Sequence, residues 1–233
     1  VFSLDPKTDK LSFEYEVAEE QIDLFKVYNN TLFIPGHDGT EKWEFGNIYK
    51  KSNEKWNKYR TLPNALHVYD LVLKEEKIFT AVGLNKFGAV FTSDLSANTW
   101  EEIPQGSGRV YSFLEVGDEL FATKTFKAND VNKLSVTQWE KSKNSFLDRL
   151  DLNAYKMFPN TNFENKSIKI IKPLKFDEKS SFYLGAYKHN DHQNIPFGLF
   201  KASINNKNLE VTKVILPNEF IPRDIIKRDN DLY

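Results

Sequence analysis

A β-hairpin is encoded in the stretch Val68-Tyr-Asp-Leu-Val-Leu-Lys-Glu-Glu-Lys-Ile-Phe-Thr80. Two segments rich in β-branched and aromatic residues flank a short polar turn, a pattern typical of two paired strands. The pattern returns in Val110-Tyr-Ser-Phe-Leu-Glu-Val-Gly-Asp-Glu-Leu-Phe-Ala122 and in 22–34, and looser copies cover 170–183 and 222–233. The chain is therefore predicted to consist of repeated hairpins.

A second hairpin lies between successive copies of the first. It begins with a glycine-led strand, and its copies start at Gly46, Gly88 and Gly198. The second strands of the first hairpin begin at positions separated by 46, 42, 62 and 50 residues, namely Leu32, Ile78, Leu120, Phe182 and Leu232. Four antiparallel strands in 40–50 residues is the size of a β-propeller blade. The sequence thus predicts an all-β propeller of four-stranded antiparallel blades, with about five blades in this chain.

The ends of the chain bear on its extent. The N-terminus supplies the outer two strands of a blade, in 1–4 and 11–17, and the C-terminus supplies the inner two, in 223–227 and 231–233. We expect one propeller domain over 1–233. Either its ends complete a shared blade in a five-bladed ring, or the chain is an excerpt of a larger propeller. The long third spacing predicts an insertion at about 144–165, with a short helical turn near Phe146–Leu150.

The turn after the second glycine-led strand carries a family resemblance. It reads Ser93-Asp-Leu-Ser-Ala-Asn-Thr-Trp100 and resembles the Asp-box of BNR/sialidase-like propellers, Ser-any-Asp-any-Gly-any-Thr-Trp. Ser93, Thr99 and Trp100 match the motif in register. Leu95 stands in place of its Asp and Ala97 in place of its Gly. The blade pattern is similar to that of the wider sialidase/BNR/YVTN-type superfamily. The resemblance implies the propeller fold, and because the family's turn is structural it implies no catalytic residue.

Composition excludes several functional classes. Apolar residues make up 40% of the 233 positions and charged residues 28%, as in ordinary globular chains. With 32 basic and 33 acidic residues there is no basic excess for nucleic acid, and no apolar run is long enough to insert into a membrane. The absence of cysteine excludes disulfides, thiol nucleophiles and cysteine-based zinc sites. The chain begins with Val and shows no signal peptide, so we expect a processed chain or an excerpt.

Propeller topology identifies candidate site residues. The innermost strand of each blade starts beside the central channel, and the loops between second and third strands open on the same face. Gln21, His67 and Arg109 each lie 11 residues before a second-strand anchor, and Asp70 and Asp224 each lie eight before one. The loops that open on this face contain all the other histidines. The predicted ligand-binding set is His37, Asp38, Trp43, His67, Asp70 and Arg109.

Each candidate has an alternative interpretation. His189, Asp191 and His192 have the side chains of a transition-metal site, but they also suit a surface loop, and we expect no metal and no cofactor. His67 has the pKa range of a general acid or base, or it satisfies buried backbone groups. Arg109 either clamps a carboxylate or phosphate through two hydrogen bonds, or pairs with an aspartate of the chain.

No motif places a nucleophile, so the leading hypothesis is a non-catalytic recognition or scaffold propeller, acting outside the cytoplasm. It would bind a glycan or a protein partner at the channel-mouth face. One alternative is a glycosidase-type hydrolase that uses Asp38, His67, Asp70 and Arg109. Such an enzyme needs two carboxylates about 5–10 Å apart. The other alternative is a structural subunit of a larger assembly.

Overall fold

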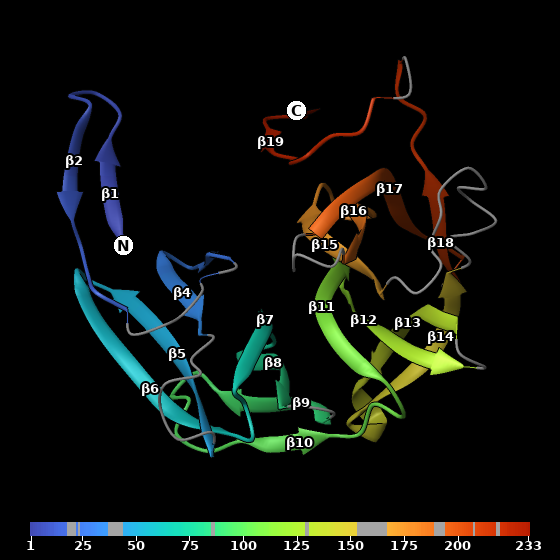
Figure 1. Ribbon diagram of the computed structural model, residues 1–233, viewed down its shortest axis with the longest axis horizontal. Coiled ribbons are helices and arrows are strands. Elements are labelled where there is room, and N and C mark those ends of the chain that lie inside the picture. Colours follow the sequence, from blue (N-terminus) through green and yellow to red (C-terminus); the bar gives the residue numbers. More distant parts are fainter. Residues whose placement is uncertain are drawn as a thin grey trace. The chain divides into compact units, whose positions relative to one another are not determined.

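The structure is a computed structural model that describes residues 1–17, 22, 24–36, 44–84, 87–128, 131–152, 167–188, 194–206, 208–217 and 220–233. The chain forms two compact units. Unit 1 comprises Val1–Lys86 and Thr92–Glu101, and unit 2 comprises Phe87–Phe91 and Glu102–Tyr233. Within the described residues, four sheets have four strands each and two have two strands (Figure 1).

Unit 1 begins with a two-stranded hairpin of β1 (Phe2–Asp5) and β2 (Lys10–Phe13). Two four-stranded sheets follow, in which neighbours along the chain are neighbours in the sheet. The first contains β3 (Lys26–Tyr28), β4 (Thr31–Pro35), β5 (Phe45–Ser52) and β6 (Lys55–Pro63). The second contains β7 (His67–Lys74), β8 (Lys77–Leu84), β9 (Phe87–Asp94) and β10 (Glu101–Ile103), and the boundary between the units passes through β9 and β10.

Unit 2 contains two further four-stranded sheets with the same meander order and a short terminal hairpin. The third sheet contains β11 (Arg109–Val116), β12 (Glu119–Ala128), β13 (Val131–Glu140) and β14 (Ser145–Leu152). The fourth contains β15 (Ser167–Lys175), β16 (Ser180–Lys188), β17 (Asn194–Asn205) and β18 (Asn208–Lys213). The hairpin pairs β19 (Lys227–Arg228) with β20 (Asp231–Leu232).

The predicted antiparallel hairpins are confirmed, and most inner strands begin where the sequence placed them. β7, β11 and β15 begin within three residues of the predicted Val68, Val110 and Ile170. β3 begins four residues after the predicted Ile22. β19 begins five residues after the predicted Pro222, and before it the Asp224 carboxylate accepts the Ile225 N–H at 2.9 Å. That the two terminal hairpins complete one shared blade stays a prediction.

One local prediction is wrong. Residues 146–150 form part of strand β14 and not a helical turn, and the one helical element within the described residues is the 3-10 turn η1 (Lys141–Lys143). Phe146 pairs with Trp139 across β13–β14 and is only 3% exposed. Its burial in the sheet outweighs any helical preference of so short a segment. The remainder of the predicted insertion, 153–165, lies outside the described residues.

Inner strands β7 and β11 share a β-bulge. In β7 the register shifts between Val68 and Asp70, which makes Tyr69 the extra residue. In β11 it shifts between Val110 and Ser112, which makes Tyr111 the extra residue. A bulge places neighbouring side chains off the strict alternation of a regular strand, and this explains why the period-two pattern of these strands is incomplete.

The core of unit 2 lies between its third and fourth sheets. Buried side chains of β11–β13 pack against those of β15–β17, and the ring of Tyr183 stacks on that of Phe200 at 5.1 Å between centroids. Burial raises the pKa of the Tyr183 hydroxyl far above its ordinary value, so the ring stays neutral. Within the described part of the chain, no helix has the length and apolar character needed to cross a membrane.

The turn that resembles an Asp-box is held by Asp94 and by a left-handed residue. The Asp94 carboxylate accepts hydrogen bonds from the Ser96 hydroxyl and N–H, which hold its pKa below the ordinary value. Ala97, at the glycine position of the motif, has a φ of 57° and is buried. The Trp100 indole N–H donates to the Thr61 hydroxyl at 2.9 Å, which ties the end of the turn to β6.

Ala97→Gly should stabilise the protein. An L-residue in the left-handed region costs roughly 1–2 kcal/mol, part of which is offset by the extra freedom of glycine in the unfolded chain. We expect a net gain of about 0.5–1 kcal/mol, or about 2–3 °C in the midpoint of thermal unfolding. The matched control is Ala202→Gly, on extended and buried backbone of β17, which should lose stability. A lower midpoint for Ala97→Gly would contradict the left-handed assignment.

Candidate functional site

Two of the candidate site residues are the first residues of inner strands, one in each unit. His67 is the first residue of β7 and pairs with Gly83, while Arg109 is the first residue of β11 and pairs with Thr125. Both side chains are half-buried, and the His67 ring stacks on Tyr69 with centroids 5.7 Å apart. His67 and Arg109 thus each begin an inner strand, and that they line one ligand site stays a prediction. His67 belongs to unit 1 and Arg109 to unit 2.

The backbone before Arg109 is fixed by buried polar groups. The Gln105 side-chain amide donates to the carbonyls of Gly88 at 3.1 Å and Gly108 at 3.2 Å. The backbone carbonyl of Gln105 accepts a hydrogen bond from the Lys124 ammonium at 3.0 Å. Lys124 is almost fully buried, and its ammonium also pairs with the Asp148 carboxylate at 2.6 Å. Arg109 therefore extends from a fixed backbone, as precise ligand binding requires.

Gly88 allows β9 to approach the start of β11. A Cβ atom at this position would lie 3.0–3.2 Å from the side chain and Cα of Arg109. In unit 1, a Cβ on Gly46 would lie only 2.2 Å from the Ala65 carbonyl oxygen, two residues before β7. The glycine at the second position of β5 and of β9 thus accommodates the segment leading into an inner strand.

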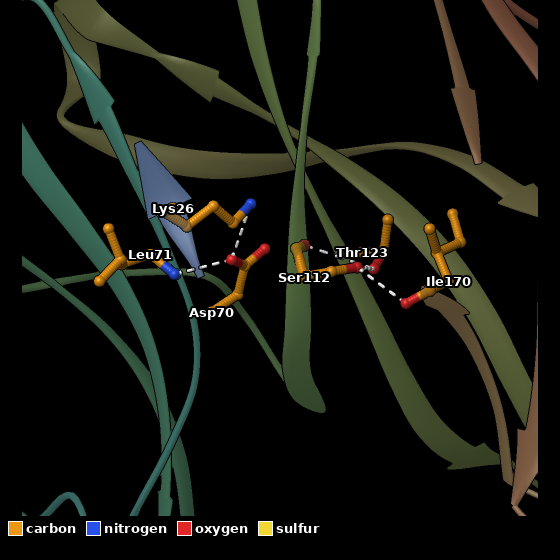
Figure 2. Close-up of polar contacts among 6 residues, drawn as sticks. All are labelled: Lys26, Asp70, Leu71, Ser112, Thr123 and Ile170. Carbon is orange, nitrogen blue, oxygen red and sulfur yellow. Dashed lines mark hydrogen bonds and ion pairs between the residues drawn. The ribbon is translucent and has the colours of Figure 1, made fainter. Parts of the chain in front are cut away.

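The Asp70 carboxylate is buried and interacts with other groups of the chain. Its carboxylate lies 3.0 Å from the Lys26 ammonium and accepts the Leu71 N–H at 2.8 Å, as Figure 2 shows. The Asp70 side chain is 2% exposed and that of Lys26 is 20% exposed. The ion pair joins inner strand β7 to inner strand β3 of the preceding sheet, which is a structural role. That Asp70 contacts a ligand directly stays a prediction.

The equivalent positions of unit 2 also join neighbouring inner strands. Ser112 of β11 shares a 2.6 Å hydrogen bond with Thr123 and donates to the Ile170 carbonyl of β15 at 3.2 Å (Figure 2). Asp224, before β19, lies 3.3 Å from the Lys172 ammonium of β15. In β7 and β11 the polar residue that follows the bulge therefore connects its strand to another inner strand, and Asp224 makes a similar contact from the segment before β19. The sequence showed the equivalence of Asp70 and Asp224 but not these partners.

The remaining predicted site residues lie outside the described residues. These are His37, Asp38, Trp43 and Gln21, together with the candidate metal ligands His189, Asp191 and His192. Among the residues that the structure describes, no three His, Cys, Asp or Glu side chains are grouped so as to hold a metal ion.

Unit 2 also has a polar cleft that the sequence did not indicate. It has a volume of about 500 Å³ and lies between the third and fourth sheets. The third sheet contributes Glu119, Phe121, Gln138 and Arg149, and the fourth contributes Ile204, Asn208 and Leu209. Arg149 was noted in the sequence only as one of few arginines. Its use in a cleft depends on a sheet register that no local pattern reveals.

These antiparallel sheets of four meandering strands define an all-β protein of the β-propeller class. A structure of Penicillium chrysogenum alpha-L-arabinanase complexed with arabinobiose is similar, with a TM-score of 0.51 and 10% identity over 85% of this chain and 67% of that chain. The polysaccharide lyase Uly1 is similar with a TM-score of 0.50 and 11% identity, over 83% of this chain and 54% of that one. At these identities the similarity shows the fold. No family model matches the chain, and no curated protein matches it.

Proposed function

We propose that this chain is a non-catalytic recognition propeller that binds a glycan at the face where its inner strands begin. The observation that carries the proposal is made within each unit separately: a partly exposed polar residue begins an inner strand, His67 at the start of β7 in unit 1 and Arg109 at the start of β11 in unit 2. An imidazole and a guanidinium offer hydrogen bonds that suit hydroxyl and carboxylate groups. His37, Asp38 and Trp43 are proposed to complete the site from the preceding loop.

Two observations favour a glycan ligand without catalysis. Both similar structures named above belong to proteins whose names refer to saccharide polymers, which favours a glycan over a protein partner. Glycoside hydrolysis needs a pair of carboxylates that reach the substrate, whereas Asp70 is buried and bound to Lys26. Recognition therefore ranks above hydrolysis. The proposal includes a BNR/sialidase-like relationship. It also includes a location outside the cytoplasm, and cell fractionation tests that location.

Arg109→Ala should abolish most glycan binding. Loss of a charge-assisted bidentate contact typically costs about 2–3 kcal/mol, which is at least a tenfold loss of affinity. The measurement is binding to an array of neutral and uronate-containing oligosaccharides, followed by calorimetric titration of the best ligand. Thermal unfolding followed by circular dichroism shows whether the variant folds.

The matched control is Arg228→Ala, since Arg228 is an exposed arginine of the short strand β19. We expect it to bind as tightly as the parent protein. His67→Gln provides a second, milder variant in case Arg109→Ala unfolds. Equal affinity of Arg109→Ala and Arg228→Ala would contradict the proposed site, and a parent protein that binds no glycan on the array would overturn the proposed function.

A further inference from the structure

The cleft between the third and fourth sheets is lined by a continuous polar network. The Gln138 amide NH₂ donates to the Glu119 carboxylate at 2.8 Å, and its carbonyl oxygen accepts from Arg149 Nε at 2.8 Å. Because Glu119 only accepts and Arg149 only donates, the orientation of the Gln138 amide is fixed. A terminal nitrogen of Arg149 also lies 3.5 Å from the Glu140 carboxylate. The network crosses β12, β13 and β14 in order.

A β-bulge directs Arg149 into this network. Val136 of β13 pairs with Leu150 and Thr137 pairs with Asp148, so Arg149 is the extra residue of β14. Bulges are frequent near functional sites because they redirect a side chain away from the regular alternation. The Arg149 side chain is 40% exposed, so its head group is accessible to solvent.

The network retains hydrogen-bonding capacity toward the cleft. Among the described residues, the second Glu119 carboxylate oxygen and Arg149 Nη1 make no hydrogen bond or ion pair. The opposite wall comes from the turn region of β17 and β18, where Ile204 and Leu209 pair across the strands, with Asn208 beside them. The cleft therefore combines donors, acceptors and an apolar wall, at the opposite end of the β11–β12 hairpin from Arg109.

The chemistry of this cleft selects one class of ligand. The cleft is lined by one carboxylate, Glu119, and one guanidinium, Arg149, which also pairs with Glu140, so no positive charge is left in excess to favour an anion. The polar groups of this wall disfavour a purely apolar molecule. A neutral sugar has donors and acceptors on adjacent carbons together with apolar C–H faces, which matches both walls. The volume of about 500 Å³ is within the range of small-ligand sites. We propose that this cleft is a second site, independent of the channel-mouth face, that binds one or two units of a neutral glycan.

Methyl-labelled protein can test the proposal directly, because the methyl groups of Ile204 and Leu209 line the cleft and report binding there by NMR. The probes are arabinobiose, xylobiose, cellobiose, maltose and lactose, with glucuronic acid as an anionic comparison. We expect at least one neutral disaccharide to shift these methyl signals with a dissociation constant on the order of 1 mM, a typical weak affinity. The methyl signals of Ile225, buried in a separate cluster, should stay unchanged.

Arg149→Met keeps the aliphatic part of the side chain and removes the guanidinium, and we expect at least tenfold weaker binding. Gln138→Leu is a second variant that breaks the network without altering charge. Arg228→Met is the matched control and should bind as the parent does. Arg109→Ala should leave the Ile204 and Leu209 shifts intact even where channel-mouth binding fails, which separates the two sites. No shift with any neutral probe, unchanged binding by Arg149→Met, or stronger binding of glucuronic acid would overturn the proposal.

Discussion

Lys26→Met should lower the free energy of unfolding by about 3–5 kcal/mol, as expected when one partner of a buried ion pair is removed. The Lys26 ammonium lies 3.0 Å from an Asp70 carboxylate whose side chain is only 2% exposed. After the substitution this carboxylate keeps the Leu71 N–H but loses its ion pair with Lys26. The measurement is urea denaturation followed by circular dichroism, with the free energy extrapolated to zero urea.

The matched control is Lys172→Met, which removes the equivalent partner of Asp224. This pair is 3.3 Å apart and its side chains are 50% and 60% exposed. Exposed pairs contribute about 0–1 kcal/mol, so the control should lose little. A double variant, Lys26→Met with Asp70→Leu, should recover most of the loss because it leaves no buried charge. Equal losses for Lys26→Met and Lys172→Met would show that burial of Asp70 does not determine the effect.

Gly46→Ala should also destabilise unit 1 strongly, by about 3 kcal/mol or more, at the upper end of what overpacking usually costs. The new Cβ would lie 2.2 Å from the Ala65 carbonyl oxygen and 2.6 Å from its Cβ. The contacted atoms belong to the backbone and to a short side chain, so no rotamer change relieves the overlap. The segment between β6 and β7 would have to move. Thermal and urea unfolding both measure the loss.

Gly88→Ala provides the graded comparison. Its Cβ would lie 3.0–3.2 Å from the Cγ, Cβ and Cα atoms of Arg109, so the neighbouring segment has to shift by only a few tenths of an ångström. We expect a loss of about 1 kcal/mol, toward the lower end of overpacking effects. Similar losses for the two alanine variants would indicate that the close approach at Gly46 is not limiting.

The strands could be predicted from the sequence because their signal is local. Repeated segments of β-branched and aromatic residues around short polar turns predict the starts of β7 and β11 to within one residue, and place His67 and Arg109 at equivalent positions. The segment at 146–150 was misassigned because five residues carry too little periodicity to distinguish a strand from a helical turn. Its assignment to β14 depends on pairing with β13, which is tertiary information.

The candidate site was predictable only in part. The repeat alignment identified Asp70, but its burial and its pairing with Lys26 depend on strand packing across 44 positions of sequence. Nothing in the sequence predicts the burial of Lys124, because a lysine within a strand is ordinarily exposed. In the structure Lys124 is only 2% exposed. Arg149 reaches the cleft through a bulge, and a bulge of this kind has no sequence signature of its own.

The bulges in the inner strands also determine where this repeat tolerates a change in length. Deleting Tyr111 would leave Val110 opposite Lys124 and Ser112 opposite Thr123, so that every following side chain keeps its face of the sheet. A deletion elsewhere in the strand would turn one segment over and expose its core residues. Tyr69 occupies the same place in β7. Gaps in alignments between repeat copies therefore belong at these two tyrosines, where a lost residue changes the strand's bend but not its buried face.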